Sequence, residues 1–404
     1  MAERLLVKLR SGAAPRAASL QVRMEPLYDV RPTLAGAAEP QWFIVEPAAN
    51  PNPWDSAHDR MALQLGVGAD EVLFVEPDLV HNIYKDPDEH AERQPLAVGE
   101  SCDNTSQDGN NGKVTGPMWD WHLDDDHSQL GAARAAVTFA APRTRVAHID
   151  TGYSRIHETT PVHINRSLEK SFVEGDPDPD SAEDPDRQVP ILDNSGHGTG
   201  TIGILAGKRS SVLNGIIGGA PDAEVVPLRV ADRVVLLRTS ALARAFRYAA
   251  EQQCDVITLS MGGLPSKAWS EAVDAIYEAG VCLCAAAGNH VGALPPRTLV
   301  YPARYPRAIA VCGVMADGSP YADLKGTELE GSHGPASAMR AAIAAYTPNI
   351  PWARFGCDTA VRLNGEGTSA ATPQVAAAAA LWIEKHKASL PRDWRRVEAV
   401  MGDL

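Results

Sequence analysis

The sequence has no long hydrophobic run. Nowhere does it contain the about twenty consecutive apolar residues that a bilayer-spanning helix needs. Its first eight residues, which include Glu3 and Arg4, also lack the uninterrupted apolar stretch of a secretory signal. These absences argue against membrane attachment and lead us to expect a cytoplasmic protein. The alternative is a secreted protein whose signal peptide has been removed.

Positive charge is scarce as well. The 404 residues include 37 Lys and Arg against 51 Asp and Glu, which gives a formal net charge of −14. Surfaces that bind nucleic acid need clustered Lys and Arg, so this balance argues against a nucleic-acid partner and favours solubility. The length exceeds one minimal domain, and the 44% hydrophobic content supports a substantial core. We therefore expect two domains.

Cysteines are few for this length. The six are Cys102, Cys254, Cys282, Cys284, Cys312 and Cys357. Most lie in apolar, strand-like runs, so we expect buried free thiols rather than disulfides. Cys282 and Cys284 share one face of an expected strand, and no second pair or histidine cluster has the spacing of a zinc site.

What the sequence does contain is a serine in an unusual setting. Ser369 lies in the segment Gly367–Pro373, just before an alanine-rich run that is typical of a buried helix. A helix N-terminus presents free backbone N–H groups, and a serine becomes a nucleophile when a neighbouring base removes its proton. Pro373 is expected in the first helical turn. Taken alone, however, Gly-Thr-Ser before a helix is also typical of an ordinary N-cap.

Three other residues supply what an activated serine requires. Asp150 ends the apolar strand Val146–Ile149, which would deliver a carboxylate to the edge of a sheet. His197 stands between two glycines before a short buried helix and is the candidate base. Asn289 follows another apolar strand and can donate a side-chain hydrogen bond to an oxyanion.

In this order along the chain, the four residues resemble the catalytic residues of the subtilisin (subtilase) family of serine proteases. Other segments resemble the substrate-binding and neighbouring motifs of that family at the same relative positions. These are Ser260, Met261, Gly262 and Gly263; Ala287 and Gly288; Gly219–Pro221; and Tyr301–Pro306. Together the motifs extend from Asp150 to Pro373, which is more than half of the chain.

The resemblance implies an α/β catalytic domain at residues 117–404, with a largely parallel central sheet and helices on both faces. Alternating patterns support this and predict strands at 224–230, 255–260 and 281–285 and helices at 240–252, 268–279 and 392–401. The implied chemistry is acyl transfer without a cofactor. His197 takes the proton of Ser369, Asp150 fixes the imidazole tautomer, and Asn289 stabilises the oxyanion.

The resemblance also implies how a substrate binds. A polypeptide would lie as an extended strand against Ser260–Gly262 and against a second edge at residues 233–236. His290 follows Asn289 where many relatives carry a small or acidic residue. It either alters the first specificity pocket or is a surface-loop histidine.

Two further departures lie close to the triad. Gly200-Thr201-Ile202-Gly203 stands where the family commonly has His-Val-Ala-Gly, which changes a neighbour of the base and not the base itself. His148, two residues before Asp150, is interpreted as a satisfied histidine on the alternate face of the strand and is given no role.

Residues 1–86 alternate strand and helix patterns and predict a small α+β (ferredoxin-like) domain. Its last strand pattern, Glu71–Asp78, resembles the end of the family's inhibitory propeptide. This implies a folding chaperone and inhibitor that acts in cis; the alternative is an unrelated accessory domain. Residues 87–116 are rich in Asp, Gly, Asn and Ser and predict a flexible linker, in which we expect the self-cleavage of a zymogen.

A second polar insert lies between Asp150 and His197. Its carboxylates at 174–180 and 183–186 could bind calcium, a common stabiliser in the family. Its prolines and the absence of an EF-hand pattern favour a solvated acidic loop, which would border the cleft and select basic substrates. We expect a dedicated processing protease held in check by its N-terminal domain. A broad degradative protease and a catalytically silent peptide-binding module are the alternatives.

Overall fold

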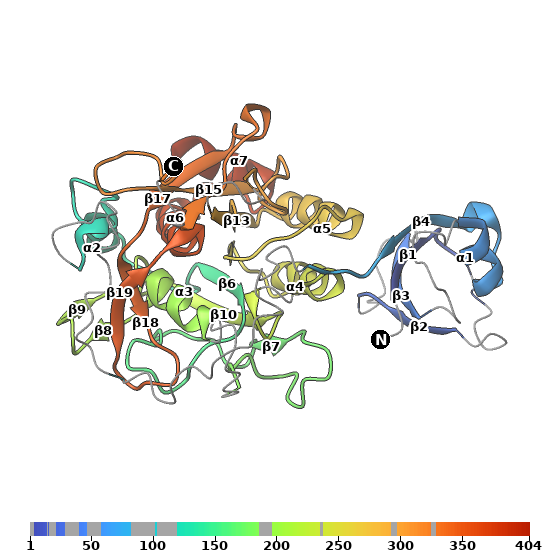
Figure 1. Cartoon of the computed structure of the whole chain (residues 1–404), viewed down its shortest axis with the longest axis horizontal. Coiled ribbons are helices and arrows are strands. Elements are labelled where there is room, and N and C mark those ends of the chain that lie inside the picture. The colour runs from blue at the N-terminus through green and yellow to red at the C-terminus, as the bar shows by residue number, and fades with distance from the viewer. Residues whose placement is uncertain are drawn as a thin grey trace.

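The computed structural model describes residues 4–13, 15, 22–28, 40–46, 58–81, 102, 119–185, 196–234, 237–291, 297–324 and 329–404. Apart from Cys102, the predicted linker 87–116 lies outside these residues. Figure 1 shows a large part built around one sheet and a smaller N-terminal part beside it.

The large part is organised by a sheet of seven parallel strands, in the order β17-β15-β13-β12-β6-β10-β7. In sheet order the strands are Ala342–Tyr346, Ile309–Val314, Cys282–Ala286, Val256–Leu259, Arg145–Asp150, Glu224–Arg229 and Lys170–Ser171. The central strands are almost entirely apolar because both faces of a parallel sheet are covered. The predicted α/β architecture is confirmed.

Helices cover both faces of this sheet. On one face α4 (Thr239–Glu251) and α5 (Lys267–Glu278) pack against Ala147 and Ile149 of β6. On the other face α3 (His197–Ala206) and α6 (Gly367–His386) pack against Val146 of the same strand. Two shorter helices, α2 (Leu130–Ala136) and α7 (Trp394–Asp403), join this second layer. Because side chains alternate along a strand, the even-numbered residues of β6 point toward α3.

Smaller antiparallel pairs surround the sheet. They are β8 (Arg209–Ser210) with β9 (Gly215–Ile216), β14 (Asn289–Val291) with β16 (Leu329–Gly331), and β18 (Ile350–Ala353) with β19 (Val361–Gly365). The segments β14 and β18 lie close to the candidate catalytic residues. None of the described helices has the length and apolar character needed to cross a membrane.

The N-terminal region has an antiparallel sheet of its own, in the order β2-β3-β1-β4. These strands are Arg23–Pro26, Gln41–Glu46, Leu5–Leu9 and Val72–Pro77, and the helix that packs on them is α1 (His58–Leu65). The arrangement agrees with the predicted small α+β unit. A second helix between β1 and β2, as in a ferredoxin-like fold, would fall largely on residues outside the described ones.

The two faces of the N-terminal sheet bury different partners. Leu5 and Val7 of β1 join a local core with Met61 of α1. Leu6 and Trp42, on the opposite face, belong to the same hydrophobic cluster as α4 and α5. The N-terminal sheet is therefore enclosed between its own helix and two helices of the large part (Figure 1).

Two expectations are wrong in detail. A disulfide joins Cys102 to Cys357, whereas the other four cysteines are free thiols, as expected. The pair is 255 residues apart in sequence, a contact that no local pattern encodes. Pro373 is not in the first turn of its helix, because α6 begins at Gly367 and Pro373 lies in the second turn.

Candidate active site

Asp150 and His197 meet where β6 ends and α3 begins. His197 Nδ1 lies 2.7 Å from Asp150 Oδ1, and the backbone N–H of Thr151 donates to the same oxygen at 2.8 Å. The other oxygen, Oδ2, accepts a hydrogen bond from Thr201 Oγ1 at 3.0 Å. Burial opposes ionisation of Asp150, but the adjacent His197, together with His148 and the Thr151 N–H, outweighs it, so the pKa of the carboxyl lies below its usual value.

Glycines on both sides of His197 allow this close approach. Gly196 has a left-handed φ of 77°, and a Cβ there would lie 1.9 Å from Phe355 Cβ. A Cβ on Gly198 would lie 1.9 Å from the carbonyl oxygen of Gly152. Both positions are therefore closed to any side chain. The chain uses them to bring the first turn of α3 against the end of β6.

Trp352 is a member of this site that the sequence did not reveal. Its ring meets the His197 imidazole edge-on, with centroids 5.4 Å apart and an interplanar angle of 63°. It lies on β18 and occupies the space that a side chain at position 200 would need, since a Cβ on Gly200 would lie 1.9 Å from Trp352 Cε2. Gly200, where the family commonly has a histidine, indicates that another side chain fills the space beside His197. The sequence does not identify that side chain as Trp352.

Ser369 lies in the first turn of α6, after a glycine with a left-handed φ of 72° at position 367. Its hydroxyl donates to the carbonyl oxygen of Ser260 at 3.4 Å, and Ser260 Oγ donates to the Ser369 carbonyl at 3.1 Å. Pro373 explains the second contact, because it has no N–H to donate to the carbonyl four residues earlier. Within the described residues no hydrogen bond joins Ser369 to His197.

Asn289 is held in a fixed orientation beside Ser369. Its Oδ1 accepts from the backbone N–H of Thr368 at 2.8 Å and from Thr368 Oγ1 at 3.2 Å. A Cβ on Gly367 would lie 2.8 Å from Asn289 Nδ2, so only glycine fits there. The oxygen of the amide is thus occupied by Thr368, and Nδ2 is its donating end.

The predicted substrate-binding segment forms the wall next to Ser369. Gly263 pairs with Tyr301 through two backbone hydrogen bonds of 2.7 and 3.0 Å, and Met261 is buried. A Cβ on Gly262 would lie 2.4 Å from Val300 Cγ2. Nearby, Ala287 is buried in the core and the Gly288 N–H donates to Thr368 Oγ1 at 3.2 Å.

The second predicted edge, at residues 233–236, is only partly described, because residues 235 and 236 lie outside the described part. A short strand, β11 (Leu237–Arg238), follows it directly. It pairs antiparallel with β5 (Val80–His81) of the N-terminal region. An edge strand of two residues is set by its partner, and the local sequence does not specify it.

Two histidines near the triad also differ from expectation. His290 is not a surface residue, because it is buried on β14 with Nε2 3.8 Å from Glu330 Oε2. His148 is not on the alternate face from Asp150, since residues two apart on a strand share a face. Its Nε2 lies 2.8 Å from Thr201 Oγ1, on the α3 side of the sheet.

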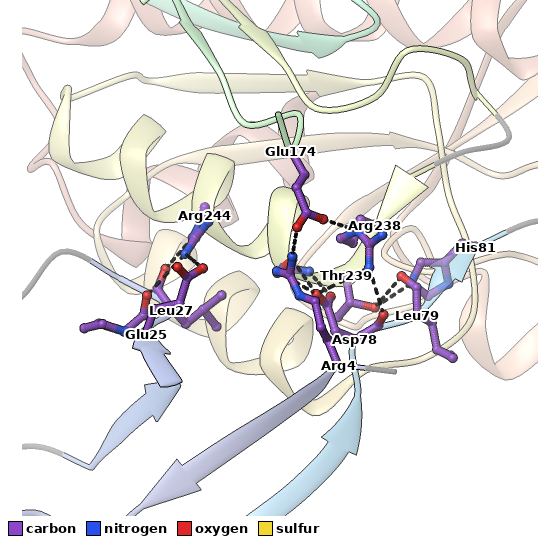
Figure 2. A network of polar contacts seen from close by, with 12 residues as sticks. Arg4, Glu25, Leu27, Asp78, Leu79, His81, Glu174, Arg238, Thr239 and Arg244 are labelled. Atoms are coloured by element: carbon purple, nitrogen blue, oxygen red, sulfur yellow. Dashed lines mark hydrogen bonds and ion pairs between the residues drawn. The ribbon is translucent and has the colours of Figure 1, made fainter. Parts of the chain in front are cut away.

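The N-terminal region contacts the large part through two carboxylates at helix N-termini. Glu76 accepts from the backbone N–H groups of Lys267 and Ala268 at 2.8 and 2.9 Å, where α5 begins. Asp78 accepts from the N–H of Ser240 at 2.8 Å, where α4 begins, and pairs with Arg4 at 3.2 Å. Figure 2 shows Asp78 at the centre of this network. Negative charge at a helix N-terminus is stabilised by the unpaired N–H groups there.

His81 lies at the end of this contact (Figure 2), and its ring is next to Gly263 of the predicted substrate-binding segment. Its Nδ1 accepts from the N–H of Leu264 at 3.0 Å, and its Nε2 lies 2.8 Å from Thr239 Oγ1. The ring packs on Trp269 with centroids 4.4 Å apart. Burial lowers the pKa of His81 to about 4, which keeps the imidazole neutral.

Several carboxylates of the acidic insert form ion pairs with arginines. Glu174 pairs with Arg4 and Arg238, Asp176 with Arg229, and Glu183 with Arg155. Guanidinium groups thus neutralise these three carboxylates, while Asp178 and Asp180 are exposed, as in the predicted solvated loop. In the described part of the chain no group of three or more His, Cys, Asp or Glu is placed to hold a metal ion.

Comparison with known proteins agrees with this geometry. The sequence profile of the subtilase family matches residues 142–401. The chain is 30% identical over 251 residues to subtilisin E of Bacillus subtilis (strain 168), which covers 61% of this chain and 57% of that protein.

Two other relatives match over a larger share of their own length. Subtilisin of Bacillus pumilus is 30% identical over 251 residues, or 61% of this chain and 79% of that protein. Subtilisin Savinase of Lederbergia lenta is 30% identical over 244 residues, or 60% and 77%. Since the family profile covers well over half of the sequence, the chain belongs to the subtilase family of serine endopeptidases, which need no cofactor for catalysis.

Proposed function

We propose that the protein is a serine endopeptidase in which Asp150, His197 and Ser369 form the catalytic triad and Asn289 donates to the oxyanion. The observation that carries the proposal is the 2.7 Å contact between His197 Nδ1 and Asp150 Oδ1. A carboxylate on Nδ1 holds the proton there and leaves Nε2 as the basic nitrogen. Membership of the subtilase family supports the same assignment.

In the proposed reaction, Ser369 Oγ attacks the carbonyl carbon of a peptide bond while His197 Nε2 takes its proton. The same proton then passes to the leaving amine, and a water molecule repeats the sequence to release the acyl group. In the structure without substrate, Ser369 donates to Ser260 instead, and catalytic hydrogen bonds often align only when substrate is bound. The negative oxygen would be stabilised by Asn289 Nδ2 and by N–H groups at the start of α6.

Hydrolysis of a mixed peptide library by the full chain tests this activity. The expected result is cleavage by the wild type and none by Ser369→Ala, with both proteins showing the same thermal unfolding. Substrate capture without cleavage by the wild type would instead favour the silent peptide-binding module. Because the library reports every cleaved sequence, a narrow pattern would support a dedicated processing protease and a broad one a degradative protease.

For the N-terminal region, residues 1–86, we propose a propeptide-like role as inhibitor in cis. Two observations support it. The strand β5 already occupies the edge at β11, and His81 packs beside Gly263, on which a Cβ would lie 2.5 Å from the ring. A polypeptide substrate bound as an added strand would need the same edge. The N-terminal region and a substrate would therefore compete.

Self-cleavage is proposed within residues 87–116, and the disulfide makes its position measurable. Cys102 lies inside this range and is bound to Cys357 of the large part. A cut before Cys102 frees the N-terminal fragment, whereas a cut after it leaves the fragment attached until the disulfide is reduced. Intact masses of wild type and Ser369→Ala, measured with and without reductant, distinguish these outcomes. Identical masses after long incubation would overturn self-cleavage.

The disulfide also bears on where the protein works. Disulfides persist in oxidising compartments and are rare in the reducing cytosol. We therefore favour a secreted or otherwise oxidising location over the cytoplasmic one. Quantifying the free thiols of the protein isolated from its native source tests this, since an oxidised Cys102–Cys357 pair leaves four free thiols and a reduced one leaves six.

A further inference from the structure

A second histidine lies behind the proposed triad, in the core rather than in the cleft. His148 is 1% exposed and occupies the central strand β6, two residues before Asp150. Its Nε2 lies 2.8 Å from Thr201 Oγ1, and Thr201 Oγ1 lies 3.0 Å from Asp150 Oδ2. The direct separation of His148 Nε2 from Asp150 Oδ2 is 4.0 Å, too long for a hydrogen bond. Thr201 therefore connects the two.

The available donors and acceptors determine which way the hydrogen bonds between His148, Thr201 and Asp150 run. Thr201 has one hydroxyl proton and two acceptors within reach, Asp150 Oδ2 at 3.0 Å and the Gly198 carbonyl at 3.3 Å. The carboxylate is nearer and charged, so it is the stronger acceptor. If Thr201 donates to Asp150, its oxygen must accept from His148, and His148 must carry its proton on Nε2.

The opposite tautomer would leave more groups unsatisfied. His148 Nδ1 has no hydrogen-bond partner among the described residues. With the proton on Nδ1, a buried N–H would be left unpaired, and Thr201 would donate to His148 and abandon Asp150. An unpaired buried donor and a carboxylate with one donor fewer both cost stability. The Nε2–H tautomer avoids both.

We propose that His148 and Thr201 are positioning residues that hold Asp150 from behind, through the directed chain His148 Nε2–H to Thr201 Oγ1–H to Asp150 Oδ2. The proposal rests on the proposed catalytic role of Asp150. With Oδ2 fixed by Thr201, Oδ1 is held toward His197 Nδ1. The chain therefore orients the imidazole through its carboxylate, and neither His148 nor Thr201 touches the substrate.

His148 does not exchange its proton in this role. Burial lowers the pKa of His148 to about 4. The nearby His197 also lowers this pKa, whereas the charge of Asp150 raises it. These two residues, one on its own strand and one on α3, are the titratable groups that act on it. The imidazole is therefore neutral at the pH at which His197 would act as a base, and its tautomer can be measured.

Nuclear magnetic resonance of the full chain in its Ser369→Ala form tests the tautomer without any requirement for activity. Two-bond 1H–15N correlations distinguish the Nε2–H, Nδ1–H and doubly protonated imidazoles, and His148→Gln identifies the resonance. The expected result is a neutral Nε2–H tautomer for His148 from pH 6 to pH 9. A Nδ1–H tautomer or an imidazolium in that range would overturn the proposal, even if the protease activity is established.

Matched variants at Thr201 test the effect on reactivity. Thr201→Val removes the hydroxyl at nearly constant shape, and Thr201→Ser keeps it. We expect labelling by a fluorophosphonate probe to slow about tenfold in Thr201→Val and to stay within about twofold of wild type in Thr201→Ser. At position 148, Gln keeps an N–H near Nε2 and should be closer to wild type than the apolar His148→Leu.

The pH profile of labelling separates positioning from packing. Without the hydrogen bond from Thr201, the negative charge of Asp150 is less neutralised. It therefore stabilises the His197 imidazolium more strongly. The inflection on the acid side should therefore move to higher pH in Thr201→Val and return to the wild-type value in Thr201→Ser. Unchanged inflections in both variants, with slower labelling explained by lower thermal stability, would contradict the proposal. If neither the wild type nor a Glu76→Ala/Asp78→Ala variant, in which the N-terminal region docks less tightly, is labelled, the proposed function fails; the tautomer result still decides the proposal for His148 and Thr201.

Discussion

The carboxylates at two places in this molecule have pKa values that are shifted in opposite directions. At the contact with the N-terminal region, burial raises the pKa of Glu76 and of Asp78 above their usual values, although helix N–H groups bind both. In the candidate active site, Asp150 is buried more deeply than either, yet its pKa is lowered. The difference lies in the partners, since Asp150 has a histidine and a set of aligned donors.

The opposite pKa shifts match the different roles that we propose for these carboxylates. A carboxylate whose charge is fully supported stays ionised and in one orientation, as a group that fixes an imidazole must. Because the pKa values of Glu76 and Asp78 are raised, their charged forms are less favourable in the buried state, and less free energy is lost when they return to water. The proposed inhibition in cis requires a contact that can be reversed, whereas the proposed triad requires a carboxylate that stays fixed.

The largest effect on activity is expected when the charge of Asp150 is removed. Asp150→Asn keeps the shape of the side chain but removes the charge and favours the wrong histidine tautomer. We expect peptide hydrolysis to fall by about 10⁴-fold, with little change in KM. Steady-state kinetics on one library-derived peptide measures this. A loss of tenfold or less would mean that Asp150 is not the residue that orients His197.

The next largest effect is expected at Asn289. Asn289→Ala removes the side-chain donor and should lower kcat by about 10²- to 10³-fold, a magnitude carried over from subtilisin. Because Asn289 Oδ1 also binds Thr368, Asn289→Asp provides a control that keeps this acceptor but has no N–H to donate. If Asn289→Asp retained the wild-type kcat, stabilisation of the oxyanion by Asn289 would be excluded.

A smaller effect is expected where the N-terminal region docks. Replacing Glu76 and Asp78 by Ala removes two helix caps and should weaken docking by about tenfold or more. In the full chain this should speed fluorophosphonate labelling by a similar factor. Glu25→Ala is the matched control, because Glu25 belongs to the same region but pairs with Arg244 at an exposed position. Equal labelling rates in the double variant and the wild type would argue against inhibition in cis.

Docking should also weaken in acid through His81. Its pKa is about 4 in the docked state, below the ordinary value of 6.5, so its contribution is fully present above pH 6.5 and is lost as the pH falls toward 4. Glu76 and Asp78, whose pKa values are raised, oppose this trend. The contribution of His81 is therefore obtained by comparing the pH dependence of docking in Ser369→Ala with that in Ser369→Ala/His81→Gln. Hydrogen exchange of the 237–240 amides measures it, and identical pH profiles would contradict it.

The smallest effect concerns Asp184, which accepts from the Gly196 N–H at 3.0 Å, just before His197. Burial raises its pKa to about 6, so the folded state favours the protonated acid. The stability that this group contributes is present below pH 4 and is lost as the pH rises through about 6. Asp184→Asn should flatten this dependence and raise Tm at pH 8 by about 2 °C in the Ser369→Ala form. A lower Tm at pH 8 would show that the charge is needed.

The parts of the site that the sequence revealed are those with a local signature. Asp150 ends an apolar strand, His197 stands between two glycines, and Ser369 follows a glycine before a helix; in each case the short segment determines the backbone that carries the side chain. The strand and helix boundaries around the central sheet were predicted within one or two residues for the same reason. Parallel strands and amphipathic helices have strong periodic patterns.

What the sequence did not reveal depends on contacts between distant segments. Trp352 reaches His197 only because Gly200 leaves room for its ring, and Cys102 pairs with a cysteine 255 residues away. Likewise β11 forms where β5 lies against it. His148 is different, because alternation along a strand already places it on the same face as Asp150. The position of His148 on that face therefore follows from the sequence alone.

The central claim, that Ser369 is an activated nucleophile served by His197 and Asp150, is tested most directly by locating a fluorophosphonate adduct. The full chain is incubated, labelled and digested, and the modified residue is identified by mass spectrometry. The account predicts one adduct, on Ser369 within the segment 367–373, and none in Ser369→Ala. The absence of this adduct from both the wild type and the Glu76→Ala/Asp78→Ala variant, whose N-terminal region is loosened, would contradict it.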